Sequence, residues 1–383
     1  MTAVQIIERI QQIDPAHWAA LFGPQPLSSQ PFLAAMEESQ SINPTHGWQP
    51  QHLVLQSESK QPQAALPLYL KQHSYGEYVF DWSWANASHR AGIPYYPKLI
   101  SAIPFTPTTG TRLGLATDSP AESTQRLLQQ LSEQAQQHNA SSWHLLFADQ
   151  KCRQRILDAW PEPCELLERH DCQYHWLNAD YRDFEHFLQR FSSRKRKMIR
   201  RERRRVQEQG VKLSRFCGET LTLEQLQSFF GFYQQTYHQR GQTPYLNWDF
   251  FRRIHQSLRN NMLLVLAEHQ QQPVGAALFL FDQQSLYGRW WGGHTQYDCL
   301  HFEACYYQGI EFAIENKLER FDPGTQGEHK LLRGFEPTRT SSLHWIRHPG
   351  LHRAVQQSLI QERQQVAAYM QQARQQLPFK RSE

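Results

Sequence analysis

The spacing of hydrophobic and polar residues switches between two periods along the chain. Apolar residues that recur every three or four positions mark one face of a helix, whereas alternation in stretches rich in β-branched and aromatic residues marks a strand. The first pattern predicts helices at residues 5–22, 31–40, 119–138, 180–191, 192–210, 223–240, 301–317 and 350–377. The second predicts strands at residues 52–56, 64–74, 75–82, 141–148, 172–178, 211–216, 262–269, 273–282, 285–293, 318–323 and 343–347. Helices and strands mixed in this way indicate an α/β (α+β) fold.

Features of the first half of the chain return in the second half at a nearly constant interval. The matching segments are Gln61-Pro62 and Gln272-Pro273, AALPLYL (64–70) and GAALFLF (275–281), Tyr75-Gly76 and Tyr287-Gly288, and FTPTTG (105–110) and FDPGTQG (321–327). A repeat of this length indicates two copies of one domain-sized unit. In each unit we expect helices, then an antiparallel meander, and then a helix and a final strand.

The polar segment 149–170, which two prolines interrupt, is the expected boundary between the copies. We therefore predict an N-terminal domain at residues 1–165 and a C-terminal domain at residues 166–383. The second domain contains the basic helix 192–209 and the C-terminal helix 350–377.

Composition adds expectations about location and cofactors. The 383-residue chain has no apolar stretch long enough to cross a bilayer, and its first helix lacks the basic start and apolar core of a signal peptide. Its six cysteines form no C-x-x-C pair, and its histidines form no H-E-x-x-H motif. We expect reduced cysteines, no metal site and a cytoplasmic protein.

The segment 321–347 concentrates ionisable groups among glycines. Glycine lets the backbone bend and approach a ligand closely, and His329 can exchange protons near neutral pH. Lys330 and Arg333 are candidates for binding an anionic substrate. The alternative is a solvated surface loop.

A second group of polar and aromatic residues follows the strands of the first half. The candidate substrate-binding residues there are His73, Tyr75, Glu77, Asp81, Trp84, Tyr96 and Lys98. Arg289 and Trp291 lie on the strand that the repeat makes equivalent, so we expect both sets to line a cleft between the halves. Aromatic side chains there suit stacking on a sugar or a peptide, or they fill the core.

The basic helix provides the third candidate site. Its candidate anion-binding residues are Arg194, Arg196, Lys197, Arg200, Arg201 and Arg204. Such a density of like charges favours contact with RNA phosphates, a polyphosphoryl carrier or acidic lipid headgroups, the last as a peripheral membrane contact. Because few aromatic residues are interleaved, no base readout is implied. The alternative is a solvated helix that is paired with acidic residues.

Four long strings of the sequence are distinctive: LPLYLKQHSYGEYVFDWSWA (66–85), YYPKLISAIPFTP (95–107), FSSRKRKMIRRERRRV (191–206) and PGTQGEHKLLRGFEP (323–337). In these strings the chain resembles the bacterial FemAB-like family of predicted N-acyltransferases. The resemblance implies two tandem GNAT-like domains, each a mixed, largely antiparallel sheet flanked by helices. It also implies transfer of an activated acyl or aminoacyl group to an amine, with peptidoglycan biosynthesis or recognition as the setting and a cell-wall precursor as one possible acceptor.

The donor implied by this resemblance is acyl-CoA or an aminoacyl-tRNA. GNAT enzymes that use acyl-CoA hold its pyrophosphate on a loop of the form R/Q-x-x-G-x-G/A. The sequence here is Arg289-Trp290-Trp291-Gly292-Gly293-His294, with a histidine in place of the last small residue. A side chain at that position obstructs phosphates, so the departure argues against CoA.

Acyl transfer to an amine requires removal of a proton from the nucleophile and its delivery to the leaving group. Glu328 or His329 is the candidate base, and Glu303, at the start of an apolar helix, is a weaker one. Tyr306 is the candidate proton donor to the leaving group. Glu303 and Tyr306 also suit purely structural roles, as a helix cap and a packing residue.

Two functions of other classes fit the same sequence. A non-catalytic module that recognises an anionic polymer or a cell-wall fragment requires the basic helix and the aromatic residues, but not Glu328 or His329. An RNA-binding protein requires only the basic helix.

Overall fold

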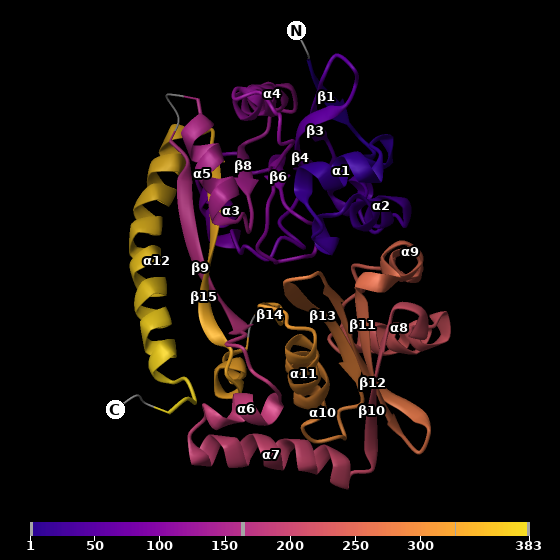
Figure 1. The fold of residues 1–383 in the computed structure, drawn as a ribbon. Helices are drawn as coiled ribbons and strands as arrows, with labels where there is room; N and C mark the ends of the chain where they lie inside the picture. Colours follow the sequence, from indigo (N-terminus) through magenta and orange to yellow (C-terminus); the bar gives the residue numbers. More distant parts are fainter. Residues whose placement is uncertain (1–2, 162–164, 326, 381–383) are drawn as a thin grey trace. The chain divides into compact units, whose positions relative to one another are not determined.

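A computed structural model describes residues 3–161, 165–325 and 327–380. The chain divides into two compact units (Figure 1). The first unit takes residues up to 171 together with 339–368, and the second takes 172–338 together with the residues from 369 onward. The predicted division placed the whole of helix 350–377 in the second domain, whereas most of it groups with the first unit. Part of the predicted boundary segment, residues 162–164, lies outside the described residues.

The first unit contains two sheets. Its elements are β1 (Val4–Ile7), α1 (Pro15–Phe22), α2 (Gln30–Glu38), β2 (Trp48–Pro50), β3 (His52–Gln56), β4 (Pro62–Leu66), β5 (Tyr69–Lys71), α3 (Trp82–Arg90), β6 (Lys98–Ser101), β7 (Gly114–Leu115), α4 (Ser123–Gln137), β8 (Ser142–Leu145) and α5 (Gln150–Ala159). One sheet has the order β1-β3-β4-β7, and the other runs from β15 (Glu336–Ile346) through β8, β6 and β5 to β2.

The second unit is built on one sheet of order β10-β11-β12-β13-β14-β9. Its elements are β9 (Leu167–Leu177), α6 (Phe184–Gln189), α7 (Ser193–Glu208), β10 (Val211–Cys217), α8 (Leu223–His238), α9 (Trp248–Leu258), β11 (Met262–His269), β12 (Gln272–Phe281), β13 (Ser285–Gly293), α10 (Leu300–Phe302), a π-helical turn (Glu303–Tyr307), α11 (Gln308–Glu315), β14 (Arg320–Asp322) and a 3-10 turn (Glu328–Arg333). Helix α12 (Pro349–Gln375) ends the chain's regular structure. The predicted α/β class with mixed sheets and flanking helices is confirmed.

Each unit contains two parallel strands joined by a crossover helix. In the first unit β6 pairs parallel with β8 and α4 connects them, whereas in the second β13 pairs parallel with β14 through α10 and α11. The predicted order of helices, meander, helix and strand is therefore present in both units.

The alignment of the two copies needs correction after β4 and β12. The strand predicted at 75–82 does not form, because Gly76 and Tyr78 have φ of +82° and +59° and turn the chain before α3 begins. By topology the counterpart of β13 is β6. FTPTTG precedes the crossover helix and FDPGTQG follows it, so these two segments are not equivalent.

Two predicted helices also differ from the structure. Residues 5–22 begin with a strand, because Val4–Ile7 pairs antiparallel with β3, and α1 begins only after Asp14 caps it. The predicted helix 301–317 is interrupted by the π-helical turn. Helix α9 was not predicted.

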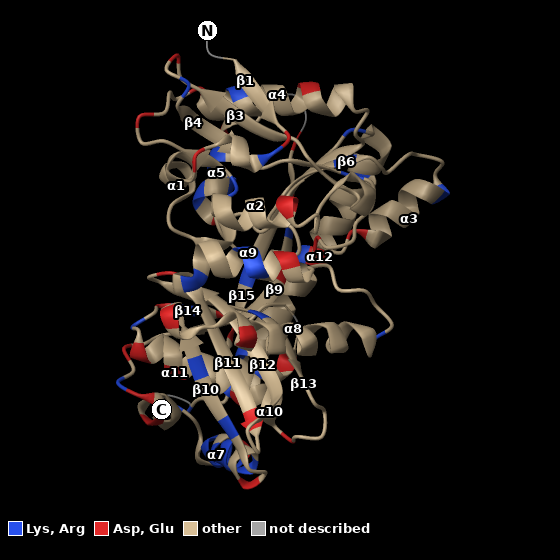
Figure 2. Ribbon diagram, turned by 90° about the vertical axis from the view of Figure 1, so that its right-hand side faces the viewer, with Lys and Arg blue, Asp and Glu red and all other residues tan. Residues whose placement is uncertain are grey.

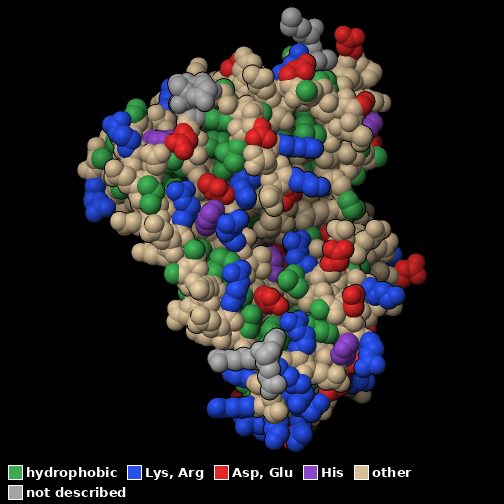
Figure 3. Space-filling model, turned by 60° about the vertical axis from the view of Figure 1, so that its left-hand side comes forward, with side chains coloured by type: hydrophobic (Ala, Val, Ile, Leu, Met, Phe, Trp, Pro, Cys, Tyr) green, Lys and Arg blue, Asp and Glu red, His purple; other side chains and the backbone are tan. Residues whose placement is uncertain are grey.

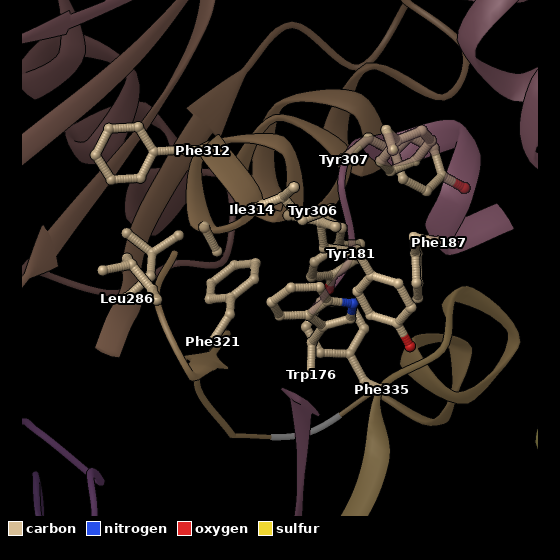
Figure 4. Close-up of a cluster of buried hydrophobic side chains, with 14 of the residues drawn as sticks. Trp176, Tyr181, Phe187, Leu286, Tyr306, Tyr307, Phe312, Ile314, Phe321 and Phe335 are labelled. Carbon is tan, nitrogen blue, oxygen red and sulfur yellow. The ribbon is translucent and has the colours of Figure 1, made fainter. Parts of the chain in front are cut away.

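A large aromatic core holds the second unit together (Figure 4). Trp176, Phe321 and Phe335 are each fully buried, and Figure 4 shows them meeting Tyr306 from the π-helical turn. Burial of side chains of this size is worth roughly 1.5–3 kcal/mol each, which anchors the turn. Among the described residues no helix is long and apolar enough to span a membrane.

Candidate functional site

The loop that follows β14 is folded back on itself by a buried lysine. Lys330 donates from Nζ to the carbonyl oxygens of Gly324 (2.7 Å) and Thr325 (3.2 Å), and the Asp322 carboxylate accepts the Gly324 N–H at 2.9 Å. Burial lowers the pKa of Lys330 to about 8. The ammonium expected to bind a substrate anion therefore closes the loop instead.

The closed loop presents His329 on the surface, next to Tyr306. His329 Nε2 and Tyr306 Oη lie 2.8 Å apart. Burial and the charges of Arg333 and Lys330 lower the pKa of His329, whereas burial raises the pKa of Tyr306. At neutral pH the imidazole is therefore uncharged and the phenol keeps its proton. The fold thus brings together two of the predicted catalytic residues.

Arg333 is buried, and each of its three side-chain nitrogens donates a hydrogen bond. Its guanidinium donates to Glu202 Oε1 (2.7 Å), to Tyr307 Oη (3.1 Å) and to the carbonyl oxygen of His329 (2.8 Å). It also lies over the Phe302 ring, 3.4 Å from the ring centre. Arg333 therefore holds the backbone of His329 in place, and its guanidinium is buried among protein groups, which does not suit the substrate-anion binding that we expected of it.

Glu303 is likewise part of an ion-pair network. Its two oxygens accept from Arg203 Nε (3.1 Å) and Nη2 (3.0 Å), and Arg203 also donates to Glu311 at 2.6 Å. This network ties α7 to α11. A carboxylate held by two bonds from one guanidinium suits a structural anchor, so the geometry does not support the predicted role of Glu303 as a base.

Glu328 is exposed and faces away from the imidazole. Its carboxylate accepts a hydrogen bond from Tyr369 Oη at 2.8 Å, and Tyr369 also contacts the Tyr174 hydroxyl. Of the two residues proposed as the main base, only His329 is paired with Tyr306.

His301 is a neighbour of this pair that the sequence did not reveal. Its ring lies 5.3 Å from Tyr306, 6.1 Å from His329 and 5.6 Å from Trp291. Burial lowers its pKa to about 4, so it stays neutral. His301 and Tyr306 are five positions apart, a spacing that shares a face only where a helix widens to a π turn. This turn brings the predicted residue Trp291 into contact with the group.

The strand β13 does not form the expected pyrophosphate loop. Arg289, the first residue of the motif, is the extra residue of a β-bulge between β12 and β13. The His294 N–H donates to the Val274 carbonyl at 2.9 Å, so it continues the strand pairing. The next helix begins only at Leu300 and has three residues. A phosphate needs free N–H groups at a helix start. These residues do not fit CoA, and we derive no step through it.

In the first unit the structure gathers predicted residues around a buried lysine. Lys98 Nζ donates to Ser74 Oγ (2.8 Å), Glu77 Oε2 (2.8 Å) and Asp81 Oδ2 (2.5 Å). The Tyr96 hydroxyl extends this network to Ser74 at 2.8 Å. Burial raises the pKa of Glu77 to about 7, whereas for Asp81 Lys98 outweighs burial and lowers the pKa to about 2. We call Lys98, Glu77, Asp81 and Ser74 the Lys98 cluster.

Aromatic side chains next to this cluster in sequence are exposed. Tyr75 is 57% exposed and packs edge-on against Trp82, which is 38% exposed, with ring centres 5.0 Å apart. His73 lies 5.3 Å from the Tyr75 ring. Trp84, in contrast, is buried, with its ring 4.9 Å from His344, so it packs in the core.

A pair of facing histidines was also missed. His144 Nδ1 lies 2.6 Å from His344 Nδ1, and Ser142 and Ser342 contact the two Nε2 atoms at 2.8 Å. Burial lowers the pKa of both histidines, so both are neutral and one ring donates to the other. The signal in the sequence is a Ser-x-His motif that occurs on both β8 and β15.

The basic residues of α7 fall into two classes. Arg200 pairs with Glu185, Arg203 with Glu303 and Glu311, and Arg205 with Asp298. Within the described residues, no hydrogen bond or ion pair engages the side chains of Arg194, Lys195, Arg196, Lys197, Arg201 and Arg204. A shallow hollow of about 370 Å³ lies between Arg194, Lys195, Lys197, Met198 and Arg201. Figures 2 and 3 show Lys and Arg gathered along this helix.

Known proteins resemble this chain at the level of family and fold. A family model described as FemAB-like, peptidoglycan biosynthesis/recognition, matches residues 9–381. No curated protein matches.

Two solved structures cover almost the whole chain. The crystal structure of FemX is 12% identical and covers 92% of this chain and 99% of its own, with a TM-score of 0.53. A conserved protein of unknown function from Bacteroides thetaiotaomicron is 11% identical and covers 91% of this chain and 100% of its own, with a TM-score of 0.52. A tandem GNAT protein from the clavulanic acid pathway is 10% identical, covers 91% and 99%, and has a TM-score of 0.43. At these identities the likeness to FemX and to the Bacteroides protein concerns the fold alone.

Proposed function

Because the chain belongs to the FemAB-like family, we propose that it is an N-acyltransferase that transfers an activated acyl or aminoacyl group to an amine, such as one on a cell-wall precursor. The observation that carries this proposal is the pairing of His329 with Tyr306 on the loop that Lys330 closes. A neutral, exposed imidazole that is oriented by a second group suits general-base work at neutral pH.

The proton path follows from the tautomer of His329. With its hydrogen on Nε2, His329 donates to Tyr306 Oη, and Nδ1 remains as the basic nitrogen. Nδ1 takes a proton from the amine as its nitrogen bonds to the acyl carbon. The imidazolium returns this proton to the leaving oxygen when the tetrahedral intermediate collapses and the acyl–oxygen bond breaks. His329 is then the catalytic residue, and Tyr306 and Arg333 are positioning residues.

The donor in this proposal is an aminoacyl ester, because the loop after β13 offers no place for the pyrophosphate of CoA. An aminoacyl-tRNA satisfies this chemistry, and α7 provides cations for its phosphates. A cytoplasmic location and the alignment of both sets of predicted residues along one cleft remain predictions.

The proposal is tested by acyl transfer with His329→Ala and Tyr306→Phe. Aminoacyl-tRNAs and acyl-CoAs serve as donors and a panel of amines as acceptors. We expect His329→Ala to lower kcat by about 100-fold or more, the usual contribution of a general base. Tyr306→Phe should shift the pH at which activity appears, because it alters the hydrogen bond on Nε2. His294→Ala is the matched control, since His294 is also exposed but has no part in the pair. Full activity of His329→Ala, or no turnover by the native protein with any donor, overturns the proposal.

One observation favours a second candidate, a non-catalytic module that binds an anionic polymer. The unpaired cations of α7 suit binding of a polyanion, which requires no chemical reaction. This candidate predicts tight, salt-dependent polyanion binding by a His329→Ala variant and no transfer by the native protein.

A further inference from the structure

The Lys98 cluster contains two carboxylate oxygens that nothing in the described structure satisfies. Glu77 Oε1 and Asp81 Oδ1 are shielded from solvent and have no hydrogen-bond partner there. The other oxygen of each carboxylate accepts a hydrogen bond from Lys98, and Asp81 Oδ2 also accepts one from Tyr95 Oη at 2.6 Å. Leaving a buried acceptor unsatisfied is costly, and more so when the group is charged. Two such atoms on neighbouring acids mark a place prepared for hydrogen-bond donors.

The charges around these oxygens favour a cationic donor. Lys98 is fully buried, and it balances only one of the two acids. Lys71 faces the same acids from β5, but it donates to the Tyr75 carbonyl at 3.1 Å, and burial lowers its pKa to about 7. His144, on β8, is neutral because burial lowers its pKa to about 3. Above pH 7, where Glu77 is ionised and Lys71 is neutral, the acid pair has one charge more than Lys98 can offset, and a second ammonium would neutralise it.

The surroundings of the acids also suit an organic cation. Trp82 directly follows Asp81, and Tyr75 lies two positions before Glu77. Their rings are exposed and form an edge-to-face pair. Aromatic faces attract ammonium groups and also cover the apolar part of a ligand. An inorganic cation would gain little from such a rim.

We propose that Glu77 and Asp81, together with the rim of Tyr75 and Trp82, bind a primary ammonium group of the acceptor substrate other than the amine that is acylated. This inference rests on the proposed transferase function and adds the chemical class that the first unit recognises. The ammonium donates to Glu77 Oε1 and Asp81 Oδ1, and the carbon frame beside it packs on the two rings.

Binding of matched small molecules to the full-length native protein tests the proposal without any acyl donor. Cyclohexylamine and cyclohexanol have the same ring and differ in the charge of one group. Proton NMR follows the indole N–H of Trp82, which is assigned from its loss in Trp82→Phe. We expect cyclohexylamine to shift this signal with saturation, and cyclohexanol to bind at least ten times more weakly.

Two variants identify the residues involved. Glu77→Gln and Asp81→Asn should each weaken the binding of cyclohexylamine at least tenfold. Glu328 is an exposed acid of the second unit, so Glu328→Gln should leave this binding unchanged. If either buried substitution unfolds the protein, Tyr75→Ala keeps the acids intact and should still weaken the binding of cyclohexylamine, because one of the two rings of the rim is lost. Equal binding of the alcohol, no binding of either compound, or unchanged affinity in Glu77→Gln and Asp81→Asn overturns the inference.

Failure of the transferase proposal gives a different result. If cyclohexylamine binds as expected but no acyl transfer occurs with any donor, the amine site stands and the transferase does not. If transfer occurs and Glu77→Gln leaves the KM for the acceptor unchanged, the transferase stands and the amine site does not.

Discussion

Arg333 and Lys330 show at the residue scale how burial decides what a charged side chain does. Both were expected to bind an anionic substrate, and both are buried with their donors taken by protein atoms. A buried cation must find internal acceptors, because removing it from water costs several kcal/mol. His329, which directly precedes Lys330, is exposed, so it remains available for chemistry.

The first prediction concerns the dependence of stability on pH. Burial raises the pKa of Glu77 from 4.5 to about 7, so the folded state binds more protons between these values and stability falls as pH rises. Burial lowers the pKa of Lys71 from 10.5 to about 7, so between pH 7 and 10.5 the unfolded state binds more protons and stability rises with pH. The two effects together place a minimum near pH 7.

Lys71→Met isolates the contribution of Lys71 to this dependence of stability on pH. We expect the rise in melting temperature between pH 7 and 10.5 to be smaller in Lys71→Met than in the native protein. Lys212→Met is the control, because Lys212 is exposed. An unchanged rise in Lys71→Met would contradict the prediction.

At the element scale, helix α7 has a face that packs on the second unit and an exposed face that carries unpaired cations. Ile199 and Val206 dock α7, and three of its arginines pair with acids. Removing one of these arginines breaks packing and ion pairs at once, whereas removing the unpaired cations changes only the outer charge. This difference separates the structural part of the basic helix from the part that can bind a ligand.

The second prediction tests this outer charge. Neutralising Arg194, Lys197, Arg201 and Arg204 to glutamine should weaken binding to duplex RNA and reduce the salt slope by about 3. Fluorescence anisotropy at several salt concentrations measures both.

The quadruple variant K60Q/R90Q/K151Q/R155Q serves as control, since it removes the same charge from exposed positions outside α7. Equal losses in both variants would mean that net charge, and not α7, is responsible. Binding to anionic vesicles but not to RNA would assign the helix to lipid headgroups.

The third prediction concerns the packing of β13 on α8. A Cβ at Gly292 would lie 2.3 Å from the Phe232 carbonyl group, whereas a Cβ at Gly231 meets nothing within 4 Å. Gly292→Ala should therefore lower the free energy of unfolding by roughly 1–3 kcal/mol through overpacking. Gly231→Ala should raise it by about 1 kcal/mol, because alanine favours the helix. Chemical denaturation distinguishes these opposite signs, and a stable Gly292→Ala variant would refute the packing argument.

At the scale of the whole molecule, the two units are not separate halves of the chain. Residues 339–368 return to the first unit, and the residues from 369 onward complete the second. In the second unit Ala373 belongs to the core, the Phe379 ring lies 5.3 Å from Phe191, and the Lys380 N–H donates to the Arg190 carbonyl at 2.7 Å. Residues 373–380 therefore contribute to the packing of the second unit.

The fourth prediction follows from this connectivity. A chain that ends at residue 368 should lose hydrogen-exchange protection in residues 172–338, because the Phe191 and Arg190 contacts disappear. A chain that ends at residue 380 is the control and should keep this protection. Protection that survives the longer truncation would show that the second unit does not depend on its last segment.

The sequence by itself determined the periodic elements and their order. The strands β11, β12 and β13 and helices α4, α7 and α8 lie close to their predicted positions, because the apolar face of a helix and the apolar run of a buried strand are both local patterns. The expectation of two domain-sized units came from the repeat. Lys98, Glu77 and Asp81 and the ionisable residues of the His329 loop were also singled out as candidates, because so many ionisable groups rarely gather by chance.

Only the tertiary structure decided which of those groups remain available. In the folded chain Lys330 donates to Gly324, Arg333 donates to Glu202, and Glu303 pairs with Arg203. The last two contacts join segments that lie far apart in sequence. The tertiary structure also decided the position of His301, which a π-helical turn moves beside Tyr306, and the pairing of His144 and His344 on neighbouring strands. Solvation and partner atoms are properties of three-dimensional packing, so no local pattern of residue types encodes them.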